Sequence, residues 1–166
     1  MINRILVGVD GSGGSRRALR WAVEEAAAHG AAVQAVTVWQ TLYEAGAVPY
    51  PVDEDKLAEQ ARERLVRAIA QVAGQHAAGI EPLVVEGDPA QTLCGRSAGA
   101  DLLVLGAHGH GGFSQPTLGS VSAKCANSSH CPVVIVPGRA RDPRWRVSQA
   151  VDGCGRCVPA VCGLRG

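Results

Sequence analysis

The chain has 166 residues, of which 46% are hydrophobic and 19% are charged, and its formal net charge is +1. These proportions are typical of a single soluble globular domain. The near-neutral charge provides no electrostatic footprint for nucleic acid or an anionic membrane, and no run approaches the ~18 apolar residues that cross a bilayer. We therefore expect a cytoplasmic protein whose partners are neither nucleic acids nor membranes.

Short apolar runs and helical patterns alternate along the chain. The first run, Ile5–Val9, is typical of a strand buried on both faces. All the runs that we predict to be strands are residues 5–9, 32–39, 82–86, 102–105 and 132–136.

Helices are predicted between these strands, and residues 40–52 are expected to be irregular. Gly30 is expected to end the first helix, and Asp88 is expected to cap a short helix whose first turn holds Pro89. The helical patterns cover residues 18–26, residues 53–73, the segment after Asp88, and residues 119–130. The alternation predicts parallel βαβ units with helices on both faces of one sheet, which is a three-layer α/β/α fold.

Ligands of such folds bind outside the carboxyl ends of the strands, where the strand order reverses. This rule points to Asp10, to Trp39 and to the loop that follows Leu105. That loop has five glycines in the fourteen positions from Gly106 to Gly119. Glycines let a backbone approach a ligand closely, and a helix that begins near Gly119 would offer free N–H groups to phosphate.

The glycine pattern is Gly, two residues, Gly, nine residues and Gly-Ser, which is neither a Walker A loop nor a dinucleotide-binding fingerprint. The hydroxyls of Ser120 and Ser122 could donate to phosphate oxygens. On the residues alone, a flexible glycine-rich surface loop is the alternative interpretation.

Four features together resemble the universal stress protein family over residues 3–136. They are the opening Ile5–Ser12 segment, Gly87-Asp88-Pro89, the glycine loop, and Cys131-Pro132 followed by Val133–Val136. The loop pattern resembles that of the ATP-binding branch. The resemblance implies a five-stranded parallel sheet in the order 3-2-1-4-5, the adenine nucleotide alpha hydrolase-like fold. It also implies a homodimer that pairs through the last strands.

The resemblance further implies an adenine nucleotide across the carboxyl edge of the sheet. Asp10 and Val38 would frame the adenosine, and Gly8, Val9 and Leu105 would line the same edge. Asp10 has an alternative role as the former of a turn after the strand. Ribose and phosphates would be held by Gly106, Gly109, Gly119, Ser120, Val121 and Ser122.

ATP is the expected ligand, with Mg²⁺ or Mn²⁺ able to accompany its phosphates. His108 and His110 stand where many relatives carry Arg, Ser or Lys, and neutral histidines would favour AMP or cyclic AMP instead. A His-x-His metal site is also conceivable, but the neighbouring sequence offers no acidic or cysteine partner, which favours solvated loop histidines.

The function classes that remain are a nucleotide-binding module in a stress response, a weak ATP-hydrolysing or nucleotidyl-transferring enzyme, and a dimeric adaptor without nucleotide. The sequence presents no paired carboxylates at the expected site and no lysine in the phosphate loop, so the binding module is favoured over catalysis. The intact loop argues against the adaptor.

We place the nucleotide-binding domain at residues 1–138 and expect a disordered tail at 139–166. The tail cysteines, Cys154, Cys157 and Cys162, are too few for a structural zinc site. In the domain, Cys94, Cys125 and Cys131 are expected to be small buried hydrophobes in the reduced form.

Overall fold

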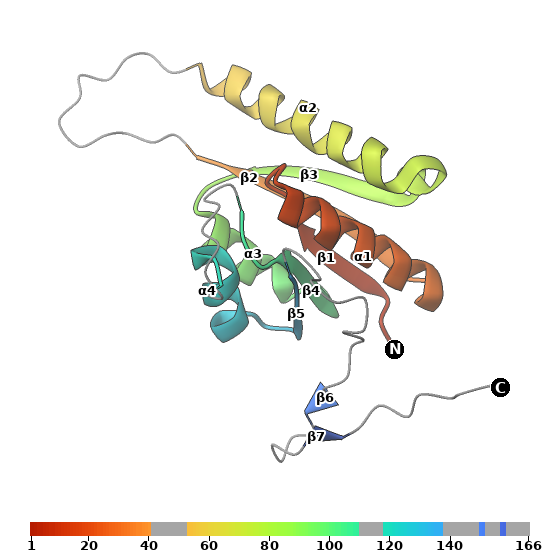
Figure 1. Ribbon diagram of the computed structural model, residues 1–166. Helices are drawn as coiled ribbons and strands as arrows, with labels where there is room; N and C mark the ends of the chain where they lie inside the picture. Colours follow the sequence, from red (N-terminus) through yellow and green to blue (C-terminus); the bar gives the residue numbers. More distant parts are fainter. Residues whose placement is uncertain (41–52, 110–117, 138–149, 152–156, 159–166) are drawn as a thin grey trace.

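A computed structural model describes residues 1–40, 53–109, 118–137, 150–151 and 157–158. Its main body is one five-stranded sheet with helices on both faces (Figure 1), and all four strand pairings are parallel. The strand order β3-β2-β1-β4-β5 confirms the predicted order. The strands are β1 (Arg4–Gly8), β2 (Ala32–Trp39), β3 (Ile80–Glu86), β4 (Leu102–Gly106) and β5 (Val133–Val136).

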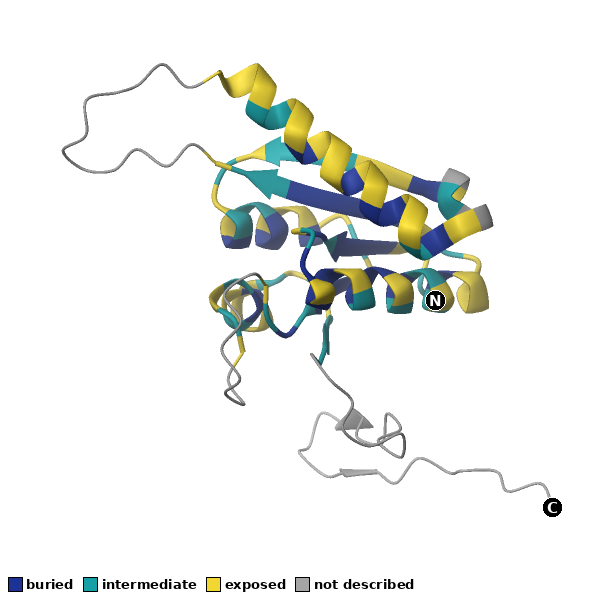
Figure 2. Ribbon diagram, turned by 45° about the horizontal axis from the view of Figure 1, so that its top comes forward, coloured by how far each residue is buried: buried dark blue, intermediate teal, exposed yellow. Residues whose placement is uncertain are grey.

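The helices form two layers, one on each face of the sheet. Successive residues of β1 point to opposite layers: Ile5 and Val7 pack with α1 and α2, whereas Leu6 packs with α3 and α4. Figure 2 shows the sheet-facing sides of α1 and α2 as buried and their outer sides as exposed. The four helices are α1 (Gly13–His29), α2 (Glu54–Ala73), α3 (Pro89–Ser97) and α4 (Ser120–Ser128).

The predicted caps are found where the sequence places them. Asp88 caps α3 by accepting a hydrogen bond of 2.8 Å from the N–H of Gln91, and Gly30 ends α1 with a left-handed φ of 68°. Asp53 caps α2 by accepting from the N–H of Lys56 at 3.0 Å. These short-range signals fix where α2 and α3 begin and where α1 ends.

The sequence prediction missed one element near the start of β3. A 3-10 helix, η1 (Gly74–Gly79), follows α2, and β3 begins at Ile80 rather than at Pro82. Proline is tolerated inside β3 because β3 is an edge strand. An edge strand can place the missing N–H of a proline on its open side, where no hydrogen bond between strands is lost.

A separate two-stranded antiparallel sheet pairs β6 (Ala150–Val151) with β7 (Cys157–Val158). The other residues of the predicted tail, and most of the predicted irregular segment 40–52, lie outside the described residues. Within the described part of the chain, every helix is too short or too polar to cross a bilayer.

The end of β4 touches the first turn of α1 through backbone alone. A Cβ atom on Gly106 would lie 2.7 Å from the carbonyl carbon of Gly14 and 2.9 Å from its oxygen. A Cβ on Gly14 would in turn collide with the carbonyl oxygen of His108. Two glycines are therefore required where the loop after β4 crosses the start of α1.

We predict that Gly106→Ala destabilises the protein by about 1–3 kcal/mol, because the new methyl group meets backbone atoms that cannot rotate away. Urea unfolding of the purified variant measures this. Gly95→Ala is the matched control, since a Cβ on Gly95 in α3 meets nothing within 4 Å. The control should be as stable as the parent or up to about 1 kcal/mol more stable. Equal stability of the two variants would contradict the close approach.

Candidate functional site

The loops after β1 and β4 meet at the carboxyl edge of the sheet, because these two strands are neighbours. A Cβ atom on Gly109 would lie 2.5 Å from Oδ2 of Asp10. The backbone of the glycine loop therefore lies directly against the Asp10 carboxylate. The contact joins two residues that are 99 positions apart and that the sequence analysis assigned to one site.

Asp10 also forms the turn that was its alternative role. Its Oδ1 accepts a hydrogen bond of 2.9 Å from the N–H of Ser12, and Ser12 in turn caps α1 by accepting from the N–H of Ser15 at 3.1 Å. The turn role and a ligand role are compatible, since one carboxylate oxygen holds the turn while the other faces Gly109. The turn fixes the carboxylate in place before any ligand arrives.

The first turn of α4 begins beside the same loop. Gly119 is the N-cap, and its N–H donates to the carbonyl oxygen of Ala107 at 2.8 Å, which brings the two ends of the glycine loop together. No side chain caps this helix within the described residues. Uncapped first-turn N–H groups at the positive end of a helix favour an anion.

The two serines of this turn differ in what they can offer a ligand. Ser122 is buried, and its hydroxyl donates to the carbonyl oxygen of Gly106 at 2.7 Å. Its proton therefore ties α4 to β4, which leaves its backbone N–H for the expected phosphate contact. Ser120 is exposed and has the more accessible hydroxyl, and Val121 lies half-buried between them.

Beside Asp10, a cavity of about 240 Å³ opens between the ends of β1 and β2 and the start of α2. Val38, predicted to frame an adenosine, lies in its wall. The buried Thr37 hydroxyl donates to the carbonyl oxygen of Val9 at 2.7 Å, so this polar group is satisfied without a ligand. The lining residues are Asp10, Gly11, Thr37, Val38, Trp39, Gln40, Leu57, Ala61, Arg64 and Leu65.

The wall formed by α2 is the part of the site that the sequence analysis missed. Leu57, Ala61 and Leu65 recur at helical spacing, and the sequence analysis included them only in the helical pattern of residues 53–73. Arg64 lies next to this stripe, and its Nε donates to the carbonyl oxygen of Gln60 at 3.1 Å. The sequence did contain a signal for this wall. Arg64 is a charged residue beside an apolar stripe, on the helix that leads away from the expected ligand edge.

Three predicted site residues have packing roles in the structure. A Cβ on Gly8 would lie 2.7 Å from Cδ2 of Leu105 and 3.1 Å from Leu93, so the strand ends need glycine there to pack against α3. Val9 and Leu105 are both buried. These residues support the edge from beneath and are absent from the cavity lining.

Neither histidine of the loop is confirmed as a solvated side chain. His108 is partly buried, and its Nε2 is buried without a hydrogen-bond partner in the part of the chain that the structure describes. His110 lies outside the described residues. Among the described residues, no three His, Cys, Asp or Glu side chains are grouped closely enough to hold a metal ion.

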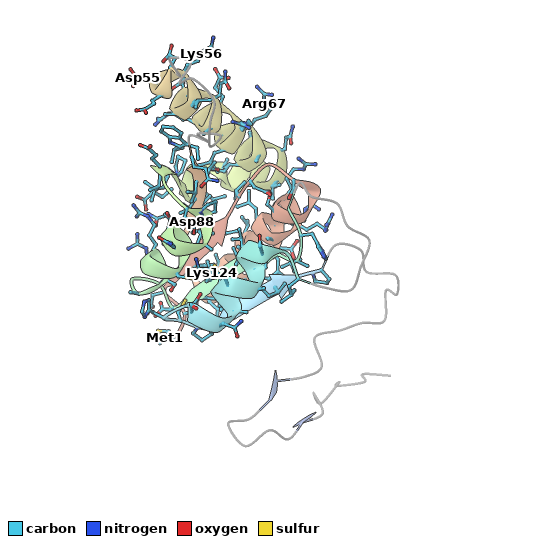
Figure 3. All side chains as sticks on the ribbon, turned by 90° about the vertical axis from the view of Figure 1, so that its left-hand side faces the viewer. Met1, Asp55, Lys56, Arg67, Asp88 and Lys124 are labelled. Carbon is cyan, nitrogen blue, oxygen red and sulfur yellow. The ribbon has the colours of Figure 1, made fainter. Side chains whose placement is uncertain are left out.

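The positive charge of Lys124, which lies on α4, is already paired. Figure 3 labels Lys124 and Asp88, whose Nζ and Oδ1 atoms lie 3.8 Å apart. Both side chains are about half exposed, so this ion pair is weak. An anion at this turn would be held mainly by backbone N–H groups and the helix dipole.

Comparisons with known proteins identify relatives of this chain. A universal stress protein of Mycolicibacterium smegmatis is 33% identical over 160 residues, which cover 90% of this chain and 54% of that protein. The chain spans about half the length of the first curated relatives that it matches.

Two solved structures share the fold and carry nucleotides. A universal stress protein in complex with cAMP is 30% identical with a TM-score of 0.59, and the match covers 81% of this chain and 97% of the other. The universal stress protein from Archaeoglobus fulgidus in complex with dAMP is 26% identical with a TM-score of 0.53, covering 82% and 99%.

The model of the family described as "Universal stress protein family" matches residues 1–137. These residues contain the complete five-stranded sheet and the glycine loop. The chain belongs to the universal stress protein family.

Proposed function

We propose that this protein binds an adenine nucleotide at the carboxyl edge of its sheet and acts as a regulatory binding module in a stress response. The contact between Asp10 and Gly109 carries the proposal, because it joins the two halves of the site. On one side lies the cavity of about 240 Å³, and on the other lies the uncapped first turn of α4. The base would occupy the cavity, the ribose would lie at the Asp10–Gly109 contact, and the phosphates would lie at the first turn of α4.

Each part of the ligand meets suitable chemistry. The base would enter the cavity against Val38 and the apolar side chains of α2. The Asp10 carboxylate would accept hydrogen bonds from ribose hydroxyls, which are charge-assisted and therefore strong. The phosphates would lie at the N–H groups of Ser120, Val121 and Ser122.

We propose ATP as the ligand, with Mg²⁺ or Mn²⁺ held through its phosphates. We also propose that the protein is cytoplasmic. AMP or cyclic AMP is the second candidate. Lys124 is already paired with Asp88, which lowers the fixed charge that α4 would supply to a triphosphate. The two related structures described above also carry single-phosphate nucleotides. Calorimetry with ATP, AMP and cyclic AMP ranks the affinities of the three nucleotides. In a separate assay, release of phosphate from ATP would favour the alternative of a slow hydrolase.

We predict that Gly109→Ala weakens nucleotide binding about tenfold or more. The added methyl group would lie 2.5 Å from Oδ2 of Asp10 and would push away the carboxylate that binds the ribose. A lost hydrogen bond to a charged group corresponds to roughly 1.5–3 kcal/mol, which is a factor of ten or more in Kd. Isothermal titration calorimetry measures it, with Gly95→Ala as the control. Unchanged affinity in a folded variant would sink the assignment.

Arg64→Ala tests the cavity wall separately. We predict that it weakens ATP and AMP by the same factor, about three- to tenfold, because Arg64 lies beside the base cavity rather than at the phosphates. Arg67→Ala is the matched control: Arg67 is exposed on the same helix (Figure 3) and does not line the cavity. A loss confined to ATP would instead place Arg64 at the phosphates. No loss would remove it from the site.

We also propose a homodimer that pairs through β5. This strand has β4 as its one neighbour in the sheet, and its four side chains are only half-buried. An exposed apolar edge of this kind favours association with another strand. Light scattering at tens of micromolar, a concentration at which exposed strand edges associate, should give twice the mass of the chain. A monomer at that concentration would contradict the proposal.

A further inference from the structure

Two free cysteines touch each other inside the layer formed by α3 and α4. Cys94 comes from the middle of α3 and Cys125 from the middle of α4, and their Sγ atoms lie 3.6 Å apart. Both belong to the apolar cluster that includes Leu6, Leu103 and Leu105. Neither cysteine lines the cavity beside Asp10, and the proposed function makes no use of the pair.

The distance between the sulfur atoms is short enough for a covalent bond after a small movement. A disulfide has a sulfur–sulfur length of about 2.05 Å, so the two atoms need to approach by about 1.6 Å. Each helix has nine residues and ends in a loop or turn at both ends. A shift of this size can be divided between two side-chain rotations and a slight approach of the helices.

The two thiols differ in exposure, and burial makes Cys125 a weak acid. Cys94 is 8% exposed, whereas Cys125 is completely buried. Burial, together with the hydrogen bond that it shares with Cys94, raises the pKa of Cys125 to about 12. At neutral pH, Cys125 therefore keeps its proton. Cys94 is the less deeply buried residue of the two, so we place the first reaction with an oxidant at its sulfur.

We propose that Cys94 and Cys125 form an oxidisable dithiol, which hydrogen peroxide converts to a disulfide between α3 and α4. The Cys94 sulfur attacks one peroxide oxygen, the O–O bond breaks, and the departing hydroxide takes the proton of the Cys94 thiol, which gives a sulfenic acid and one water. The Cys125 sulfur then attacks the Cys94 sulfur, the S–O bond breaks, and the departing hydroxide takes the Cys125 proton and leaves as the second water. Both thiols lose their hydrogen and the peroxide is reduced to two waters, so atoms and electrons balance.

A small neutral oxidant suits this position better than a bulky one. Because Cys94 is only 8% exposed, a peptide disulfide such as oxidised glutathione must displace part of the helix layer to reach it, whereas hydrogen peroxide needs a much smaller opening. The bond would join residues that are 31 positions apart, and the ring would contain β4, the whole glycine loop and the first turn of α4. Cross-links over rings of this size restrict the unfolded chain and raise the melting temperature, here by roughly 5–15 °C.

The test treats the native full-length chain with hydrogen peroxide, blocks the remaining thiols with iodoacetamide and maps tryptic peptides by mass spectrometry. Trypsin leaves Cys125 and Cys131 together on residues 125–139, whereas Cys94 lies on residues 68–96. Cys131→Ser is therefore the matched variant that assigns the bond. The tail cysteines lie on other peptides, 147–156 and 157–165.

We expect the Cys131→Ser protein to give the peptide pair 68–96 and 125–139 joined with the loss of two hydrogens. Its melting temperature should rise and should return to the starting value with dithiothreitol. An equal concentration of oxidised glutathione should form this bond at least tenfold more slowly. Three results would overturn the proposal: alkylated Cys94 and Cys125 after peroxide has oxidised Cys131 in the parent protein, a link from Cys94 to a tail cysteine, or a bond that forms only in urea.

Discussion

The close backbone approach between Gly106 at the end of β4 and Gly14 in the first turn of α1 determines the arrangement of the whole ligand edge. Because neither residue has a side chain, the loop after β4 crosses the start of α1 at van der Waals distance. The crossing brings Gly109 against Asp10, which is itself oriented by the N–H of Ser12. Ser122 then secures α4 to the same strand end through the Gly106 carbonyl. Each later contact presupposes the first.

The sequence was sufficient for the parts of the structure that depend on local patterns. Alternating apolar runs and helical stripes predicted the strands and helices, and Gly30 and Asp88 were correctly identified as caps because capping depends on a few adjacent residues. The order of the strands followed from the family resemblance and is confirmed. Within the site, the rule for ligand positions in such sheets pointed to Asp10 and to the loop after Leu105, and the structure brings these two segments into contact. Their role in nucleotide binding stays a prediction.

Contacts between distant side chains could not be predicted in this way. The hydroxyl of Ser122 was expected to face phosphate, but its position relative to Gly106 depends on how α4 packs on β4. Arg64 was missed because a helical stripe specifies which side faces the sheet, not which neighbouring residue borders a cavity. The start of β3 was misplaced because the effect of Pro82 depends on whether its strand lies at the edge of the sheet.

One wall of the cavity beside Asp10 is formed by α2, which packs on the body of the protein through one apolar stripe. The outer side of α2 faces solvent along its length, as Figure 2 shows. Local opening of such a peripheral element costs less free energy than global unfolding. A nucleotide in the cavity would contact α2 and the sheet together, and so would bind only when the helix is docked. By mass action, a higher nucleotide concentration would therefore reduce the fraction of time that α2 spends open. The exposure of the surface beneath α2 would then depend on the ligand concentration.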